Sequence, residues 1–140
     1  MNRARALSAW ILSLALCAAG CSMKADVAKA GAQVSHFHAQ LDGQDYSTIY
    51  KEADPRLREA SKQPDFVAFL EAVHRKLGKV QEAKQETFFV NYNTSGSTVR
   101  VVYATRFTGG DAREEFVWAK SGDSRQLLNY QINSNALITR

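Results

Sequence analysis

The chain has 140 residues, of which 45% are hydrophobic, and 18 Lys and Arg against 14 Asp and Glu give a formal net charge of +4. This length suffices for one domain with its own hydrophobic core. No block of like charge interrupts the sequence, so a nucleic-acid-binding protein, which needs a clustered basic surface, is not expected.

The first twenty residues have the pattern of an export signal. Arg3 and Arg5 precede an apolar run over residues 6–19, and small residues end it. This order of a basic start, a short apolar run and small residues is typical of a secretory signal peptide. The run is shorter than the roughly 20 apolar residues of a membrane-spanning helix. A buried N-terminal helix is the alternative, but the two arginines favour residues 1–20 as a signal peptide.

Two cleavage reactions fit the end of this segment. Ordinary signal peptidase requires small residues three and one before the cut, which Ala18 and Gly20 supply. The stretch AAGC over residues 18–21 also resembles the lipobox of bacterial lipoproteins, although Ala18 stands where that pattern prefers leucine. Cys17 does not fit, because the residue before it, Leu16, is too large.

The lipobox resemblance implies that Cys21 is acylated, rather than remaining a free thiol, and that residues 21–26 form a lipidated tether. Because no aspartate follows Cys21, it further implies an outer-membrane lipoprotein facing the periplasm. Two or three acyl chains on one residue anchor a protein far more firmly than one chain. Removal of residues 1–20 lowers the basic count from 18 to 16 against 14 acidic residues, a net +2, and leaves no second cysteine for a disulfide.

Residues 27–140 read as a single domain whose first half is helical. One apolar stripe recurs at helical spacing through Val27, Val34, Phe37 and Leu41, and Gly43 suits the end of that helix. Short helices are expected over residues 46–50 and 55–60, the second with Asp54 as its N-cap. The clearest helix starts at Asp65, after a break at residues 63–64, and ends at Gly78. Its predicted core face comprises Phe66, Phe69, Leu70, Val73 and Leu77.

After Gly78 the hydrophobic period changes to two, which is typical of strands. Strands are expected over residues 79–93, 98–108, 113–120 and 125–135, the last with Leu128, Tyr130 and Ile132 in alternation. Short Gly-rich turns separate them, so neighbouring strands must be antiparallel. The helices are the only cover for the apolar face of such a sheet. The sequence therefore predicts an α+β fold in which N-terminal helices pack on a four-stranded antiparallel meander.

Several segments together resemble a known group of proteins. They are Asp42-Gly43 with Tyr46 and Tyr50, KLGKV over residues 76–80, Tyr103 with Thr105 and Phe107, and the closing LLNYQINSNAL. This combination resembles a family of small bacterial lipoproteins and exported proteins with no assigned activity. Their domain is similar to the cystatin-like fold of nuclear transport factor two. The resemblance implies that fold over residues 27–138 and implies little about function.

Catalytic and metal sites are not evident in the sequence. His36 and His38 are two residues apart on a helix, about 200° of rotation, so they cannot share a metal ion. Glu114 and Glu115 point to opposite faces of a strand and cannot form an acid/base pair. No nucleophile elbow and no phosphate-binding loop is present. His38 is the best catalytic candidate, against a plainer interpretation as a partly buried histidine at a helix edge. We therefore expect no enzymatic activity, no cofactor and no metal.

Aromatic residues offer the remaining candidate site. Tyr hydroxyls and aromatic rings can line a small-ligand pocket between the helices and the sheet, although ordinary core packing is the alternative. The candidates are Tyr46, Tyr50, Tyr103, Phe107, Trp118 and Tyr130.

Three functions follow from these patterns. The first is a non-enzymatic binding or envelope-assembly module that contacts another envelope protein. The second is a small-ligand carrier or sensor that uses the aromatic cavity. The third is an enzyme with an acid/base residue in that cavity. A filled core with an exposed apolar patch would favour the first, and an open cavity containing an ionisable group would favour the others.

Overall fold

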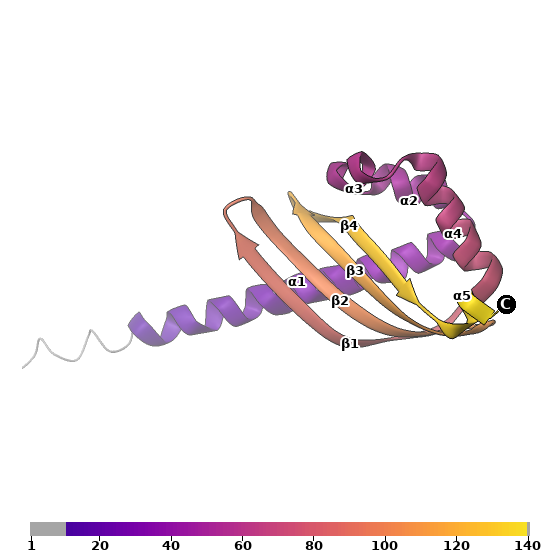
Figure 1. Cartoon of the computed structure of the whole chain (residues 1–140). Helices are drawn as coiled ribbons and strands as arrows, with labels where there is room; N and C mark the ends of the chain where they lie inside the picture. The colour runs from indigo at the N-terminus through magenta and orange to yellow at the C-terminus, as the bar shows by residue number, and fades with distance from the viewer. Residues whose placement is uncertain (1–10, 140) are drawn as a thin grey trace, which may run out of the picture.

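The computed structural model describes residues 11–139. In chain order the elements are α1 (Ile11–Asp42), α2 (Tyr46–Glu52), α3 (Pro55–Ala60), α4 (Gln63–Leu77), β1 (Val80–Asn93), β2 (Gly96–Phe107), β3 (Gly110–Ser121), β4 (Ser124–Asn133) and α5 (Asn135–Thr139). Figure 1 shows α1 running along one face of the sheet, with α2, α3 and α4 gathered at one end. This is the α+β arrangement that the sequence predicted; the short α5 and the N-terminal extension of α1 were not expected.

The N-terminal segments fall partly within this description. Residues 1–10 of the predicted signal peptide lie outside the described residues, and residues 11–20 belong to α1. Residues 21–26, predicted as a tether, are also helical and continue α1 without a break. Within residues 11–139, no helix combines the length and apolarity required to span a membrane.

The sheet is an antiparallel meander with the strand order β1-β2-β3-β4. Its alternation places every second residue of β2 on the face that α1 covers. Those residues are buried: Val99, Val101, Tyr103, Thr105 and Phe107. β1 lies at one edge, and most of its residues are exposed.

The face of α1 that meets the sheet follows the predicted helical stripe. Val34, Phe37 and Leu41 are almost completely buried, and Val27 is partly buried against the same core. Ala30 extends the stripe by one turn, so the buried positions recur at spacings of four, three and four residues.

The bounds of α4 show how local chemistry ends a helix. The helix begins at Gln63, two residues before the predicted start, because Pro64 is tolerated in the first turn, where its missing N–H is not needed. It ends before Gly78, as predicted. Gly78 has a φ of 75° and packs so closely against Thr108 that any Cβ would collide with its Oγ1.

The predicted core face of α4 is wrong at one residue. Phe69 is 39% exposed, whereas Phe66, Leu70, Val73 and Leu77 are buried. The buried residues recur at spacings of four, three and four, and Phe69 lies on the flank of that stripe. Its ring still contacts the domain, with centroids 6.5 Å from Phe66 and 6.0 Å from Tyr130.

The predicted alternation of the last strand is also wrong at one residue. Val117 pairs with Asn129, but the next residue of β3, Trp118, pairs with Leu127, which leaves Leu128 as the extra residue of a bulge. The bulge changes the parity of the strand, so Leu127 and Tyr130 are both buried and Leu128 is only partly buried.

Candidate functional site

A buried carboxylate lies at the centre of the helix–sheet interface. Glu114 has no exposed surface, and its Oε2 accepts hydrogen bonds from His38 Nε2 at 2.8 Å and from Thr105 Oγ1 at 2.5 Å. Its Oε1 accepts a bond of 2.7 Å from the hydroxyl of Tyr130. These four residues, which we call the Glu114 cluster, come from α1, β2, β3 and β4.

Aromatic rings pack against the Glu114 cluster. The ring centroid of Phe116 lies 5.8 Å from that of His38 and 5.0 Å from that of Tyr130. Burial raises the pKa of the Tyr130 hydroxyl well above its ordinary value, and the nearby charge of Glu114 raises that pKa further. A buried carboxylate with three donors has its hydrogen-bonding capacity well filled. The cluster therefore fixes how α1 sits on the sheet.

The Glu114 cluster was not predicted. Glu114 and Glu115 were predicted to point to opposite faces of the strand, which is confirmed: Glu115 lies toward Arg100 on the other face, at 4.0 Å. The pairing of Glu114 with His38 was not expected. The signal was present, because Glu114 shares the parity of Phe116 and Trp118 and is therefore a charged residue at a core position of β3.

A separate cavity of about 340 Å³ lies where α1 and α2 meet the ends of β3 and β4. Apolar and polar side chains both line it. The lining residues are Gln33, His36, Phe37, Gln40, Ile49, Glu52, Trp118, Ser124, Arg125, Gln126 and Leu127.

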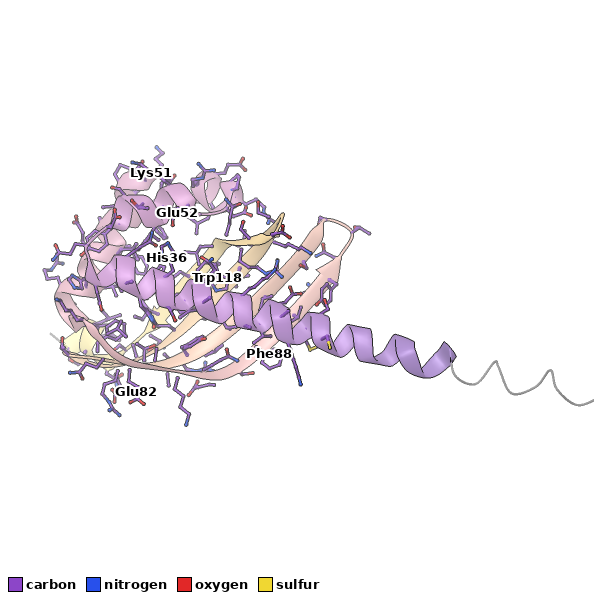
Figure 2. All side chains as sticks on the ribbon, turned by 180° about the vertical axis from the view of Figure 1, so that it is seen from behind. His36, Lys51, Glu52, Glu82, Phe88 and Trp118 are labelled. Atoms are coloured by element: carbon purple, nitrogen blue, oxygen red, sulfur yellow. The ribbon has the colours of Figure 1, made fainter. Side chains whose placement is uncertain are left out.

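Charged and amide groups link the two helices at the rim of this cavity. Glu52 of α2 accepts a hydrogen bond of 2.9 Å from Gln40 Nε2, and the same Oε2 lies 3.2 Å from His36 Nε2 on α1. Figure 2 shows His36 and Trp118 near the crossing of α1 with the sheet, and Glu52 on the neighbouring helix. The rim is therefore polar, and its ionisable groups are paired with each other.

Two nearly buried side chains of β3 and β4, Trp118 and Arg125, also line the cavity. Trp118 and Arg125 are 4% and 5% exposed, and neither Trp118 Nε1 nor Arg125 Nε has a hydrogen-bond partner among the described residues. The other end of the Arg125 guanidinium pairs with Asp26 of α1. Buried N–H groups without partners are uncommon in proteins, but these two nitrogens have almost no accessible surface and so are not open to a ligand in the cavity.

Of the six aromatic residues predicted to line a pocket, Trp118 lines this cavity. Tyr103, Phe107 and Tyr130 belong to the buried core. The Tyr46 hydroxyl is hydrogen-bonded to His74 Nδ1 at 3.0 Å. The Tyr50 hydroxyl donates to the carbonyl oxygens of Arg58 and Ser61. These five side chains therefore serve packing and helix contacts and do not converge on one cavity with Trp118.

Two residues of the predicted tether, Cys21 and Asp26, differ in their contacts. Cys21 is exposed. Asp26 instead contacts the domain, because it pairs with the buried Arg125 of β4 and accepts a hydrogen bond of 2.9 Å from Tyr92 of β1. That contact raises the pKa of Tyr92, chiefly through the hydrogen bond. Asp26, which the sequence places in the tether, therefore contacts the sheet.

Within the part of the chain described, no three His, Cys, Asp or Glu side chains gather in a way that could hold a metal ion. The chain matches no known family model, and no curated protein is significantly similar to it. The family resemblance of the sequence motifs stays a prediction.

Proposed function

We propose that this protein is a bacterial lipoprotein, anchored by acylated Cys21 at the outer membrane and facing the periplasm, whose domain is a non-enzymatic binding module. The anchor rests on the basic, apolar and AAGC pattern of residues 1–21. The exposure of Cys21 is consistent with its modification.

The observation that carries the binding proposal is the cavity between α1, α2 and the ends of β3 and β4. Its volume of about 340 Å³ falls in the usual range for small-ligand pockets, roughly 300–1,000 Å³. Phe37, Trp118 and Leu127 line the cavity but are at most 4% exposed, whereas the amides of Gln33 and Gln40 are partly exposed. We assign this cavity a small ligand with hydrogen-bonding groups that these amides can meet.

The positions and hydrogen bonds of the ionisable groups favour binding over catalysis. A general acid or base must reach the atom whose proton it transfers. Glu114 and His38 are buried and bonded to each other, and neither lines the cavity. At the rim, the Glu52 carboxylate is engaged by Gln40 and His36.

The anchor is tested by cell fractionation and mass spectrometry. The wild-type protein is expected in the outer-membrane fraction with an acylated N-terminal Cys21. The Cys21→Ala variant is expected to lose that modification and to leave the outer-membrane fraction. A wild-type protein with an unmodified Cys21 thiol would contradict the anchor.

The cavity is tested by tryptophan fluorescence of the mature protein. The chain has two tryptophans, and loss of residues 1–20 removes Trp10, so Trp118 becomes the only tryptophan, and it lines the cavity. Titration with a small-molecule extract of the periplasm is expected to shift its emission. Gln33→Leu should abolish the shift, and Gln131→Leu, an exposed residue of β4 outside the cavity, should preserve it. Equal shifts in both variants, or none in the wild type, would contradict binding there.

A second candidate function, an envelope-assembly module, is favoured by the exposed edge strand. Among residues 11–139, β1 pairs only with β2, and residues 87–93 of its other edge contain no charged side chain and no register shift. An unprotected edge of this kind can pair with a strand of another protein. Photo-crosslinking from position 91 in intact cells is expected to capture an envelope protein. Its absence there, or equal capture from position 126 on β4, would exclude this edge.

A further inference from the structure

An open groove lies between the N-terminal half of α1 and the edge strand β1, with a volume of about 600 Å³. Its walls are almost entirely apolar. The lining residues are Gly20, Met23, Lys24, Val27, Ala28 and Gly31 from α1, with Gln85 and Phe88 from β1.

The groove leaves large apolar side chains in contact with water. Met23 is 43% exposed and Phe88 is 45% exposed. Phe88 lies on the side of β1 that faces α1, since it pairs with the buried Val101 of β2, and Figure 2 shows it beside the N-terminal half of that helix. Apolar side chains gathered in a groove indicate a binding surface more often than isolated ones do.

The position of Cys21 identifies what covers this groove. Residues two and three after Cys21, Met23 and Lys24, line the groove, whereas Gly20 is removed by the proposed cleavage. Ala28 lies seven residues further on, about two helical turns, and therefore projects from nearly the same side of α1 as Cys21. A substituent on the Cys21 sulfur thus starts at the border of the apolar groove.

We propose that the groove binds an acyl chain of the lipid carried by Cys21. This inference rests on the proposed acylation of Cys21. The tether to the same helix gives the acyl chain a high effective concentration at the groove. Binding removes Met23, Val27 and Phe88 from water, and the remaining acyl chains stay in the bilayer. The lipid therefore also orients the domain, because α1 and the edge of β1 are drawn to the membrane surface.

The experiment uses the full chain, processed in a bacterial host, with the photo-crosslinking residue p-benzoylphenylalanine in place of Phe88. After irradiation of membranes, mass spectrometry is expected to find the peptide containing position 88 joined to the acylated Cys21 peptide. The matched control places the same probe at Phe89. Phe89 is on the opposite face of β1, under the Arg100 guanidinium at 5.7 Å, and should crosslink to Cys21 at least tenfold less.

The outcomes that would contradict the inference can be distinguished from those that would contradict the anchor. Crosslinks from position 88 only to phospholipids would mean that bilayer lipid, and not the Cys21 acyl chain, fills the groove, and would overturn the inference. Acylated Cys21 with no crosslink, or with equal yields from positions 88 and 89, would overturn it and leave the anchor intact. An unmodified Cys21 thiol in the same spectra would overturn the proposed anchor itself.

Discussion

His38 and Glu114 are separated by 76 residues in the chain and meet through a hydrogen bond of 2.8 Å between Nε2 and Oε2 inside the domain. Both side chains are almost completely buried. A buried carboxylate loses its hydration, so its stability depends on the donors that replace water. This contact makes the packing of α1 on β3 specific, since a shift along the helix would leave a charged group without partners.

Removal of the buried carboxylate should destabilise the domain strongly. Glu114→Ala takes away the acceptor of His38, Thr105 and Tyr130 and leaves three buried polar groups unpaired. We expect the free energy of unfolding, measured by urea denaturation, to fall by about 3–5 kcal/mol. Glu115→Ala is the control on the same strand, because Glu115 is partly exposed on the other face, and it should cost less than about 1 kcal/mol. Equal losses would show that the Glu114 cluster does not stabilise the fold.

The same cluster predicts a loss of stability at alkaline pH. Burial raises the pKa of Tyr130 well above its unfolded value of about 10. The folded protein therefore keeps this proton where the unfolded chain has released it. The resulting stabilisation is complete below pH 10 and is lost as the pH rises from there toward the folded pKa, by up to about 1.4 kcal/mol for each pH unit.

Tyr130→Phe removes the titrating hydroxyl, so this variant tests how the free energy of unfolding depends on pH. We expect the variant to be less stable than wild type at neutral pH, because Glu114 Oε1 loses its donor, and to lose less stability between about pH 10 and 11. Urea denaturation of both proteins at several pH values gives the comparison. Parallel declines of the two unfolding free energies would contradict a raised pKa at Tyr130.

Asp26 provides a test of where the folded domain begins. Its partner Arg125 has a side chain that is only 2% exposed, so loss of the carboxylate would leave a buried cation unpaired. We expect Asp26→Ala to lower the free energy of unfolding by about 3–5 kcal/mol. Lys24→Ala, an exposed residue two positions earlier, should have an effect below about 0.5 kcal/mol. If the two variants are equally stable, residues 21–26 behave as the tether that the sequence predicted.

The contrast between Asp26 and Gly78 shows what this sequence could and could not predict. Gly78 ends α4 for a local reason, and the periods of α1 and β2 are likewise local, so the order of the elements was predictable. Asp26 has no local signal, because its partner lies 99 residues away. The bulge at Leu128 also depends on pairing with β3.

The cavity could not be predicted either, because it depends on contacts between segments that are far apart in the chain. Its walls come from α1, α2, β3 and β4, and no single segment carries a recognisable motif. Aromatic content alone indicated both Trp118 and Tyr130; both belong to the buried core, and only the packing of α1 and α2 places Trp118 beside the cavity. Glu114 is the intermediate case, since its inward orientation could be read from the alternation of β3 and its partners could not.

Adjacent residues on α4 give the last prediction. Leu70 has no exposed surface, and its truncation to alanine should cost about 2–5 kcal/mol of unfolding free energy through lost burial and the cavity left behind. Phe69 is 39% exposed but touches the rings of Phe66 and Tyr130, so Phe69→Ala should cost only about 1–2 kcal/mol. Urea denaturation of both variants measures the two losses of unfolding free energy. If Phe69→Ala proves the more damaging, Phe69 belongs to the buried stripe of α4, as the sequence pattern predicted.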